Sequence, residues 1–169
     1  MTAEFTPGVS IVEVGAAGPQ LDTVRELLRE YLQSEAVQAC AGSFEDELAA
    51  LPGAYSRPAG CLLLAELGGV PAGCVAMRRI DAARCEMKRL YVRAAFRGAG
   101  LAGLLVDRII QQARAAGYRE IFLDTLPAMR AARLLYDMLG FRSCAPYLPE
   151  PTPGADCMVF DLAALRRQE

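Results

Sequence analysis

The first part of the chain changes from an alternating pattern of hydrophobic positions to a helical one. Residues 9–14 alternate in polarity and are rich in β-branched side chains, which predicts a strand. From Pro19 onward apolar residues recur three or four positions apart, and this spacing predicts an amphipathic helix. A shorter helix is expected over residues 44–51, with Ser43 as its N-cap and the acidic residues 45–47 in its first turn. The chain is therefore expected to begin with a strand followed by two helices.

The middle of the chain predicts an antiparallel meander. Residues 61–67 and 70–80 are largely apolar runs that flank Gly68-Gly69, a pair typical of a two-residue hairpin turn. Residues 81–84 form a second predicted turn, which leads into a strand over residues 85–92. Strands that are joined by such short turns are antiparallel neighbours.

From Leu101 onward the pattern changes to helices alternating with strands. Apolar residues at helical spacing predict a helix that ends at Gly117, and residues 118–124 follow as a strand. A helix between two strands is the usual crossover between parallel neighbours, so strand 118–124 is expected to run parallel to strand 85–92. The remaining predicted elements are a helix from Pro127 to Gly140, a short strand over 141–144, a proline-rich loop over 146–154 and a last strand over 156–162.

Length, composition and charge restrict the classes of partner. With 169 residues, of which 53% are hydrophobic and 22% charged, we expect a single globular domain over residues 1–169. A net charge of −2 argues against general electrostatic binding to nucleic acid. Residues 1–14 lack a basic segment followed by an apolar core, and no apolar run approaches the roughly 18 residues of a membrane span. We therefore expect a cytoplasmic protein that binds neither nucleic acid nor membrane.

The chain contains no histidine, and this limits its chemistry. Ser-His-Asp and Cys-His triads and most zinc sites are excluded, and no metal is expected. The six cysteines are scattered without a C-x-x-C pair and are expected to be small, reduced core residues. Acid–base work therefore falls to carboxylates, tyrosine, lysine or cysteine.

A glycine-rich turn after strand 85–92 predicts an anion site. Backbone N–H groups at a helix N-terminus lack intrahelical partners, so a phosphate can accept several hydrogen bonds there, and glycine lets it approach closely. Gly98 to Gly103 match G-x-G-x-x-G, and Asp124 follows at the distance of the dinucleotide-binding fingerprint. However, the preceding strand carries charged residues and follows a meander, unlike a Rossmann strand that is buried on both faces. A nucleotide-binding oxidoreductase is therefore the less favoured alternative.

The same turn also reads R-x-x-G-x-A over Arg97 to Ala102. Residues 90–102 resemble the acyl-CoA loop of the GNAT N-acetyltransferase superfamily, and residues 132–141 resemble its second motif, A-x-x-L-Y-x-x-x-G-F. Order, spacing and predicted strands agree over residues 61–144. The resemblance implies an α/β (α+β) fold, with a mixed, mostly antiparallel sheet of six to seven strands, about four flanking helices and a parallel, splayed central strand pair.

This resemblance also implies an activity. A GNAT-like enzyme would use acetyl-CoA, or a related acyl-CoA, to acylate a primary amine by direct attack in a ternary complex. Small-molecule and peptide amines are both acceptors on this scaffold, so the fold does not fix the acceptor. The alternative from another functional class is an acyl-CoA-binding module without catalytic activity. The resemblance leaves open whether the protein forms a homodimer.

The family motifs also imply a set of cofactor-binding residues. Leu90 and Val92 would bond the pantetheine arm, and loop N–H groups would bind the pyrophosphate, each charge-assisted bond contributing about 1.5 to 3 kcal/mol. Arg97 would add positive charge, or is a solvated loop residue. Met129 stands where the family usually has Asn, and it cannot form the same hydrogen bonds. The implied set is Leu90, Tyr91, Val92, Arg97, Gly98, Ala99, Gly100, Leu101, Ala102, Met129, Ala132 and Tyr136.

Three residues are implied as catalytic. The Leu90 N–H would polarise the thioester carbonyl. Tyr136 would protonate or hydrogen-bond the departing thiolate, although full transfer from a phenol to a thiolate is uphill by roughly 2 kcal/mol; a tyrosine that closes the core is the alternative. Glu86 would remove the amine proton, usually through water, or would simply pair with Lys88 or Arg78 on the sheet.

The acceptor site is expected on the side opposite the CoA. Position along the chain suggests four substrate residues, Tyr31, Tyr55, Arg78 and Tyr147. Arg78 would suit an acceptor that carries a carboxylate, or is a surface charge.

Overall fold

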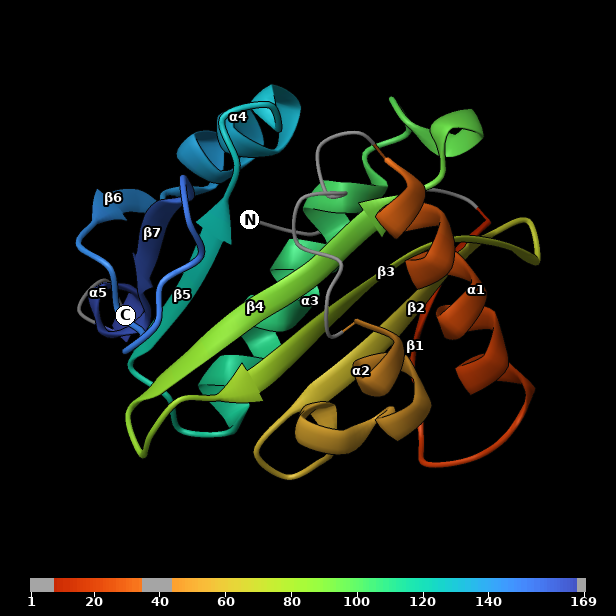
Figure 1. Cartoon of the computed structure of the whole chain (residues 1–169), viewed down its shortest axis with the longest axis horizontal. Coiled ribbons are helices and arrows are strands. Elements are labelled where there is room, and N and C mark those ends of the chain that lie inside the picture. Colours follow the sequence, from red (N-terminus) through yellow and green to blue (C-terminus); the bar gives the residue numbers. More distant parts are fainter. Residues whose placement is uncertain (1–7, 35–43, 167–169) are drawn as a thin grey trace.

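The computed structural model describes residues 8–34 and 44–166 (Figure 1). Cys40 and the predicted N-cap Ser43 lie outside the described residues. Seven strands form one sheet: β1 (Val9–Glu13), β2 (Cys61–Leu67), β3 (Val70–Arg79), β4 (Arg84–Val92), β5 (Glu120–Thr125), β6 (Arg142–Cys144) and β7 (Asp156–Asp161). Their spatial order is β1-β2-β3-β4-β5-β7-β6. All neighbours are antiparallel except β4 and β5, which are parallel, so the predicted mixed sheet is confirmed.

Helices pack on both faces of this sheet (Figure 1). They are α1 (Pro19–Gln33), α2 (Phe44–Ala50), α3 (Leu101–Ala115), α4 (Arg130–Leu139) and the short α5 (Leu162–Arg166), with 3₁₀ turns η2 (Gly53–Tyr55) and η3 (Ala94–Phe96). None of the helices in the described part of the chain is long and apolar enough to span a membrane.

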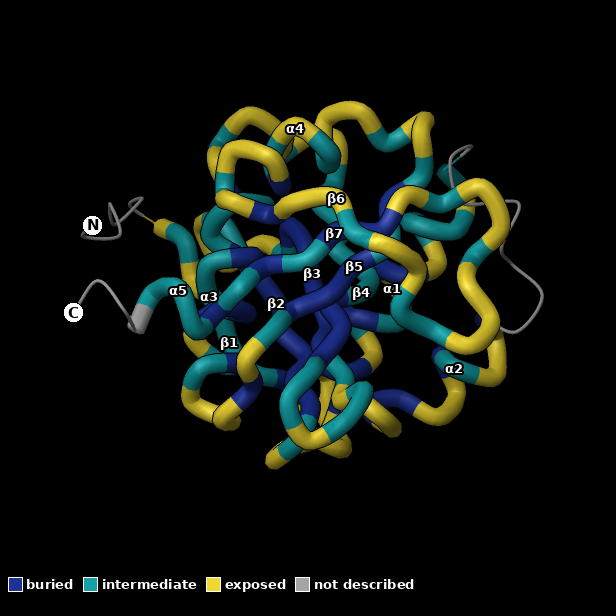
Figure 2. The backbone as a smooth tube through the Cα atoms, turned by 90° about the vertical axis from the view of Figure 1, so that its left-hand side faces the viewer, coloured by how far each residue is buried: buried dark blue, intermediate teal, exposed yellow. Residues whose placement is uncertain are grey.

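The sheet contributes to two hydrophobic cores because successive strand residues point to opposite faces. Leu62 and Leu64 of β2 pack with α1 and α2 in one core. Leu63 of β2 and Val75 of β3 pack with α3 in the other, which also contains Tyr136 of α4. Burial is accordingly concentrated in the central strands (Figure 2).

The parallel pair β4–β5 separates after a short contact. The two strands pair at three positions, of which the last joins Glu86 to Phe122. Beyond it their carboxyl ends diverge, β5 toward α4 and β4 toward η3, and the sheet opens as a V between residues 87–92 and 123–125 (Figure 1). The predicted splayed central pair is therefore present.

Several element boundaries differ by one to three residues from the sequence-based expectation, and two of these differences have a clear local cause. The fourth helix begins at Arg130 and not at Pro127, because Pro127 and Ala128 form a turn that the Met129 N–H closes on the Leu126 carbonyl at 2.8 Å. The last strand ends at Asp161, whose carboxylate accepts hydrogen bonds from the first turn of α5. Both differences arise from local turn geometry that hydrophobic spacing does not report.

Candidate active site

A bulge in β4 lies within the splayed segment. In the register with β3, Ala76 is opposite Lys88 and Cys74 is opposite Tyr91, so Arg89 and Leu90 share the space of one residue. Arg89 has φ 62°, and among the described residues it alone has positive φ without being glycine. The bulge thus places Leu90, the predicted polarising residue, outside the β3 ladder and at the V between β4 and β5.

The glycine-rich turn leads into an uncapped helix N-terminus. Gly98 and Gly100 have φ 87° and 80°, a region in which a residue with a Cβ is strained. A Cβ at either position would meet no heavy atom within 4 Å, so the backbone conformation and not lack of space explains these glycines. Gly100 is the N-cap of α3, and no side chain caps that helix. The first N–H groups of α3 are therefore available to an anion, as expected for Leu101 and Ala102.

Arg97 connects this turn to the end of β4. Its Nε donates to the Val92 carbonyl at 3.1 Å, and the side chain is exposed. The guanidinium thus lies beside Val92, another of the predicted cofactor residues.

Tyr136 is packed in the core on the α3 side of the sheet. It is 6% exposed, and its ring lies 5.6 Å from that of Phe141, centroid to centroid. Burial raises the pKa of the Tyr136 phenol above its ordinary value, and the nearby Tyr31 raises it further. Ala132, one turn earlier, packs against the same core, and Met129 is the N-cap of α4 without a capping side chain. A raised pKa keeps the phenol protonated and makes full transfer of its proton less favourable, so a hydrogen bond to sulfur is the role that remains open to it.

Glu86 lies at the floor of the opposite face with both carboxylate oxygens occupied. It is 1% exposed, and its Oε1 accepts from Arg78 Nε at 2.7 Å and lies 3.6 Å from Lys88 Nζ. Its Oε2 accepts from the Tyr147 hydroxyl at 2.5 Å. The pairing with Arg78 and Lys88 that the sequence allowed is therefore present.

The four predicted substrate residues do not form one cluster. Arg78 and Tyr147 meet at Glu86. Tyr55 is buried and donates to Glu47 of α2 at 2.6 Å, whereas the Tyr31 ring packs 5.8 Å from that of Tyr91. The structure thus brings two of the four together beside the candidate base.

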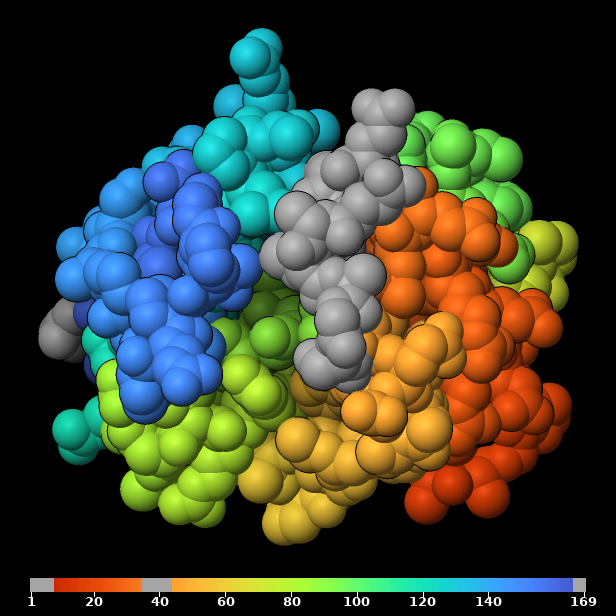
Figure 3. Space-filling view, viewed as in Figure 1, coloured from red at the N-terminus to blue at the C-terminus, as the bar shows by residue number. Residues whose placement is uncertain are grey.

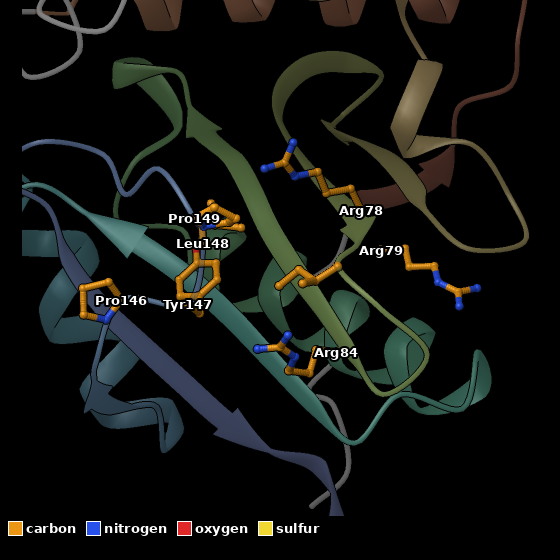
Figure 4. Close-up of a pocket in the computed structure, with 8 residues that line it drawn as sticks. Arg78, Arg79, Arg84, Pro146, Tyr147, Leu148 and Pro149 are labelled. Carbon is orange, nitrogen blue, oxygen red and sulfur yellow. The ribbon is translucent and has the colours of Figure 1, made fainter.

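A cavity of about 590 Å³ adjoins this pair. Arg78 and Arg84 line it together with the loop from Pro146 to Pro149 (Figure 4). Tyr147 stacks on Phe122 of β5, with 4.8 Å between ring centroids. In the space-filling view the surface is hollowed between the β6–β7 loop and α2, and strand residues form the floor (Figure 3). The cavity is large enough for a small ligand.

Sequence reasoning missed the residues that hold the bulge. Arg89 Nε donates to Glu47 at 2.8 Å, and its guanidinium carbon lies 4.4 Å from the centre of the Phe44 ring. Glu47 was expected only as an acidic residue in the first turn of a helix. No local pattern signals a contact between residues 42 positions apart. In the part of the chain that the structure describes, no group of His, Cys, Asp or Glu side chains is placed to hold a metal ion.

Comparison with known proteins matches the part of the chain that contains β4, the glycine-rich turn and α4. Residues 21–141 match the model of the Acetyltransferase (GNAT) family. An uncharacterised N-acetyltransferase of Schizosaccharomyces pombe is 38% identical over 145 residues, which cover 85% of this chain and 89% of that protein. An acetyltransferase structure from Streptococcus agalactiae is similar with a TM-score of 0.79 and 21% identity, covering 92% and 99% of the two chains. A GNAT family acetyltransferase from Elizabethkingia anophelis with acetyl-CoA bound has a TM-score of 0.65 and 20% identity, covering 92% and 99%.

Proposed function

Because this chain belongs to the GNAT acetyltransferase family and is an N-acetyltransferase, we propose that it transfers the acetyl group of acetyl-CoA directly to a primary amine. Acetyl-CoA is bound by a neighbour of the same fold. The observation that carries the proposal is the junction of three features: the V between β4 and β5, the bulge at Leu90 and the uncapped start of α3.

The residues of this junction suit a long anionic cofactor. The N–H groups of Leu101 and Ala102 follow a glycine N-cap and would hold the pyrophosphate. Leu90 and Val92 lie on the part of β4 that no longer pairs with β5. The pantetheine arm would form hydrogen bonds with this backbone as an added strand does. When bound, acetyl-CoA supplies the thioester.

The proposed reaction is a single displacement. The amine nitrogen forms a bond to the thioester carbonyl carbon while the carbon–sulfur bond breaks. An ammonium acceptor gives up two protons: one goes to solvent to produce the nucleophile, and one ends on the sulfur to give the CoA thiol. We assign to the Leu90 N–H the stabilisation of charge on the carbonyl oxygen, and to Tyr136 a hydrogen bond to the leaving sulfur.

Glu86 stays the candidate base for the first of these protons. The hydrogen bonds that it accepts from Arg78 and Tyr147 also give it an anchoring role. The two roles predict a different pH dependence of kcat/KM in Glu86→Gln.

Release of CoA thiol from acetyl-CoA across a panel of primary amines tests this function. At 100 times its Kd, acetyl-CoA should stabilise the protein by about 2.7 kcal/mol, or roughly 5 to 11 °C in Tm, and NADH should not. Gly100→Val should abolish the shift because a β-branched residue is strained at φ 80°. Stabilisation without thiol release by any amine would favour the silent binding module, and a shift with NADH alone would favour the oxidoreductase.

A further inference from the structure

The floor of the cleft carries one more positive charge than negative charge. Arg78 and Lys88 both approach the same oxygen of Glu86, at 2.7 and 3.6 Å. The second oxygen of Glu86 accepts from the neutral Tyr147. One buried carboxylate therefore faces two cations, which leaves a net charge of about +1 beside the cavity.

Neighbouring charges do not neutralise this excess. Arg89 is paired with Glu47 at 2.8 Å, and Arg84 is paired with Asp81 at 2.7 Å. Each of these arginines already has its own carboxylate. Arg79 also lines the cavity, but its side chain is exposed and is directed away from Tyr147 (Figure 4). The excess charge beside Glu86 is thus that of Arg78 and Lys88.

Both cations retain hydrogen-bond donors for a ligand. Among the described residues, Arg78 donates to Glu86 alone and through Nε alone, so Nη1 and Nη2 are open to a ligand. Lys88 lies within ion-pair distance of Glu86 but beyond hydrogen-bond distance. The side chains of Arg78 and Lys88 are 33% and 24% exposed, so a small molecule can reach them.

The ammonium of Lys88 is also in an unfavourable environment. Burial lowers the pKa of Lys88, and the charges of Arg89 and Arg78 lower it further, while the charges of Glu86 and Glu47 oppose them. A bound anion would relieve this, since an opposite charge favours the ionised form.

We propose that Arg78 and Lys88 bind the carboxylate of the acceptor, and that the acceptors are free α-amino acids. This inference rests on the proposed acetyltransferase function. A single excess positive charge matches a monoanionic carboxylate better than a dianionic phosphate. Arginine presents paired donors that fit a carboxylate.

The position of the two cations along β4 supports a short acceptor. Lys88 precedes Leu90 by two residues, a separation of about 7 Å in an extended strand and less at a bulge. An α-amino acid whose carboxylate lies between Arg78 and Lys88 is therefore short enough to place its amine beside the V. The loop residues Tyr147 and Leu148 bound the cavity on its far side and limit the size of the side chain (Figure 4).

The proposal is tested by matched acceptors that differ only in the carboxylate. The 20 common L-amino acids are assayed for thiol release, and each active one is compared with its carboxamide and with its decarboxylated amine. We expect kcat/KM to fall at least tenfold when the carboxylate is removed. O-Phosphoethanolamine, assayed alongside, should be a poor acceptor.

Variants connect this preference to the two cations. Arg78→Gln and Lys88→Gln should each lower kcat/KM at least tenfold for the amino acid and less than threefold for its carboxamide. Arg78→Lys should recover part of the loss. Arg119→Gln removes an exposed arginine just before β5 and should change neither value. Circular dichroism and Tm show whether each variant is folded.

Binding provides a readout that does not require turnover. Calorimetric titration of the CoA-saturated protein with the best amino acid should give a Kd that Arg78→Gln weakens at least tenfold. Equal activity and binding of acid and carboxamide would overturn the carboxylate site, while thiol release would still support the acetyltransferase. Failure of all 20 amino acids to react or bind would also overturn it, and thiol release with another amine in the panel would show that the function itself holds.

Discussion

The Arg89 guanidinium donates to the Glu47 carboxylate at 2.8 Å and so ties α2 to the bulge in β4. Arg89 occupies a left-handed backbone conformation that costs a non-glycine residue on the order of 1 to 3 kcal/mol. The ion pair with Glu47, itself bonded by Tyr55, and the stacking on Phe44 offset this cost. Since Leu90 is the next residue, α2 helps to fix the backbone on which the proposed polarising N–H depends.

The first prediction concerns the pH dependence of stability at this contact. Burial opposes ionisation of Glu47, but the hydrogen bond and charge of Arg89, together with the Tyr55 hydroxyl, lower the pKa of the carboxyl below 4.5. A lowered folded-state pKa adds stability that is present above about pH 4.5 and is lost as the pH falls through the folded value. Glu47→Gln should therefore lower the free energy of unfolding by about 1.5 to 3 kcal/mol at pH 7 and by much less at pH 3.

Denaturant titrations at pH 7, 5 and 3 measure this difference. Glu45→Gln on the exposed face of α2 is the matched control and should change the free energy of unfolding little at any pH. A loss for Glu47→Gln that is equal at pH 7 and pH 3 would contradict a contribution from the ionised carboxylate.

The contacts that hold the bulge mark the limit of what the sequence predicts. The sheet order around β4 follows from local signals, because Gly68-Gly69 and residues 81–84 are tight turns and a helix connects β4 to β5. The glycine turn before α3 is equally local. In contrast, the Arg89–Glu47 contact joins residues 42 positions apart, and no hydrophobic repeat or turn motif encodes it.

The same distinction applies within the candidate site. The motif around Tyr136 is readable in the sequence, but the burial that raises its pKa depends on packing with Phe141. Arg78 and Glu86 are opposite each other in the β3–β4 register, so their pairing follows once the hairpin is aligned. The hydrogen bond from Tyr147 to Glu86 spans 61 positions, so it becomes evident only from the position of the β6–β7 loop in the folded structure.

The second prediction concerns Tyr136. Tyr136→Phe removes the hydroxyl and keeps the ring that packs on Phe141, so folding should be preserved. We expect kcat to fall at least tenfold, with little change in the Kd of CoA, because the hydroxyl is proposed to stabilise the leaving sulfur. Tyr118→Phe, which removes a buried hydroxyl that bonds the Ala59 carbonyl, is the control and should lower Tm without a comparable loss of kcat. Unchanged turnover in Tyr136→Phe would remove this residue from the mechanism.

The third prediction concerns the N-terminus of α4. Met129 is the N-cap of this helix and provides no side-chain acceptor to the first turn. Met129→Asn should supply one and stabilise the protein by about 1 kcal/mol, or roughly 2 to 4 °C in Tm. Met129→Leu, which cannot cap the helix, should leave Tm close to that of the wild type. A Tm of Met129→Asn equal to that of Met129→Leu would contradict the capping argument. If the family's usual Asn also bonds the cofactor, titration should in addition show tighter CoA binding for Met129→Asn alone.

The last prediction separates the two roles of Glu86. Glu86→Gln keeps the shape of the side chain and removes the negative charge that Arg78 and Lys88 share. If Glu86 acts mainly as an anchor, KM for the acceptor should rise at least tenfold, because Arg78 and Lys88 lose the contact that positions them and this loss outweighs the added positive charge. The acidic limb of the kcat/KM profile should then persist. We expect this outcome, since both oxygens of Glu86 are already engaged.

Profiles of kcat and kcat/KM from pH 5 to pH 9 provide the measurement. Tyr147→Phe removes one hydrogen bond to Glu86 but leaves its charge, so this variant should raise KM less than Glu86→Gln does. Loss of the acidic limb in Glu86→Gln, with an unchanged acceptor KM and a limb that remains in Tyr147→Phe, would instead establish Glu86 as the base. The base would then act through water, because the carboxylate itself is 1% exposed beneath Arg78 and Tyr147.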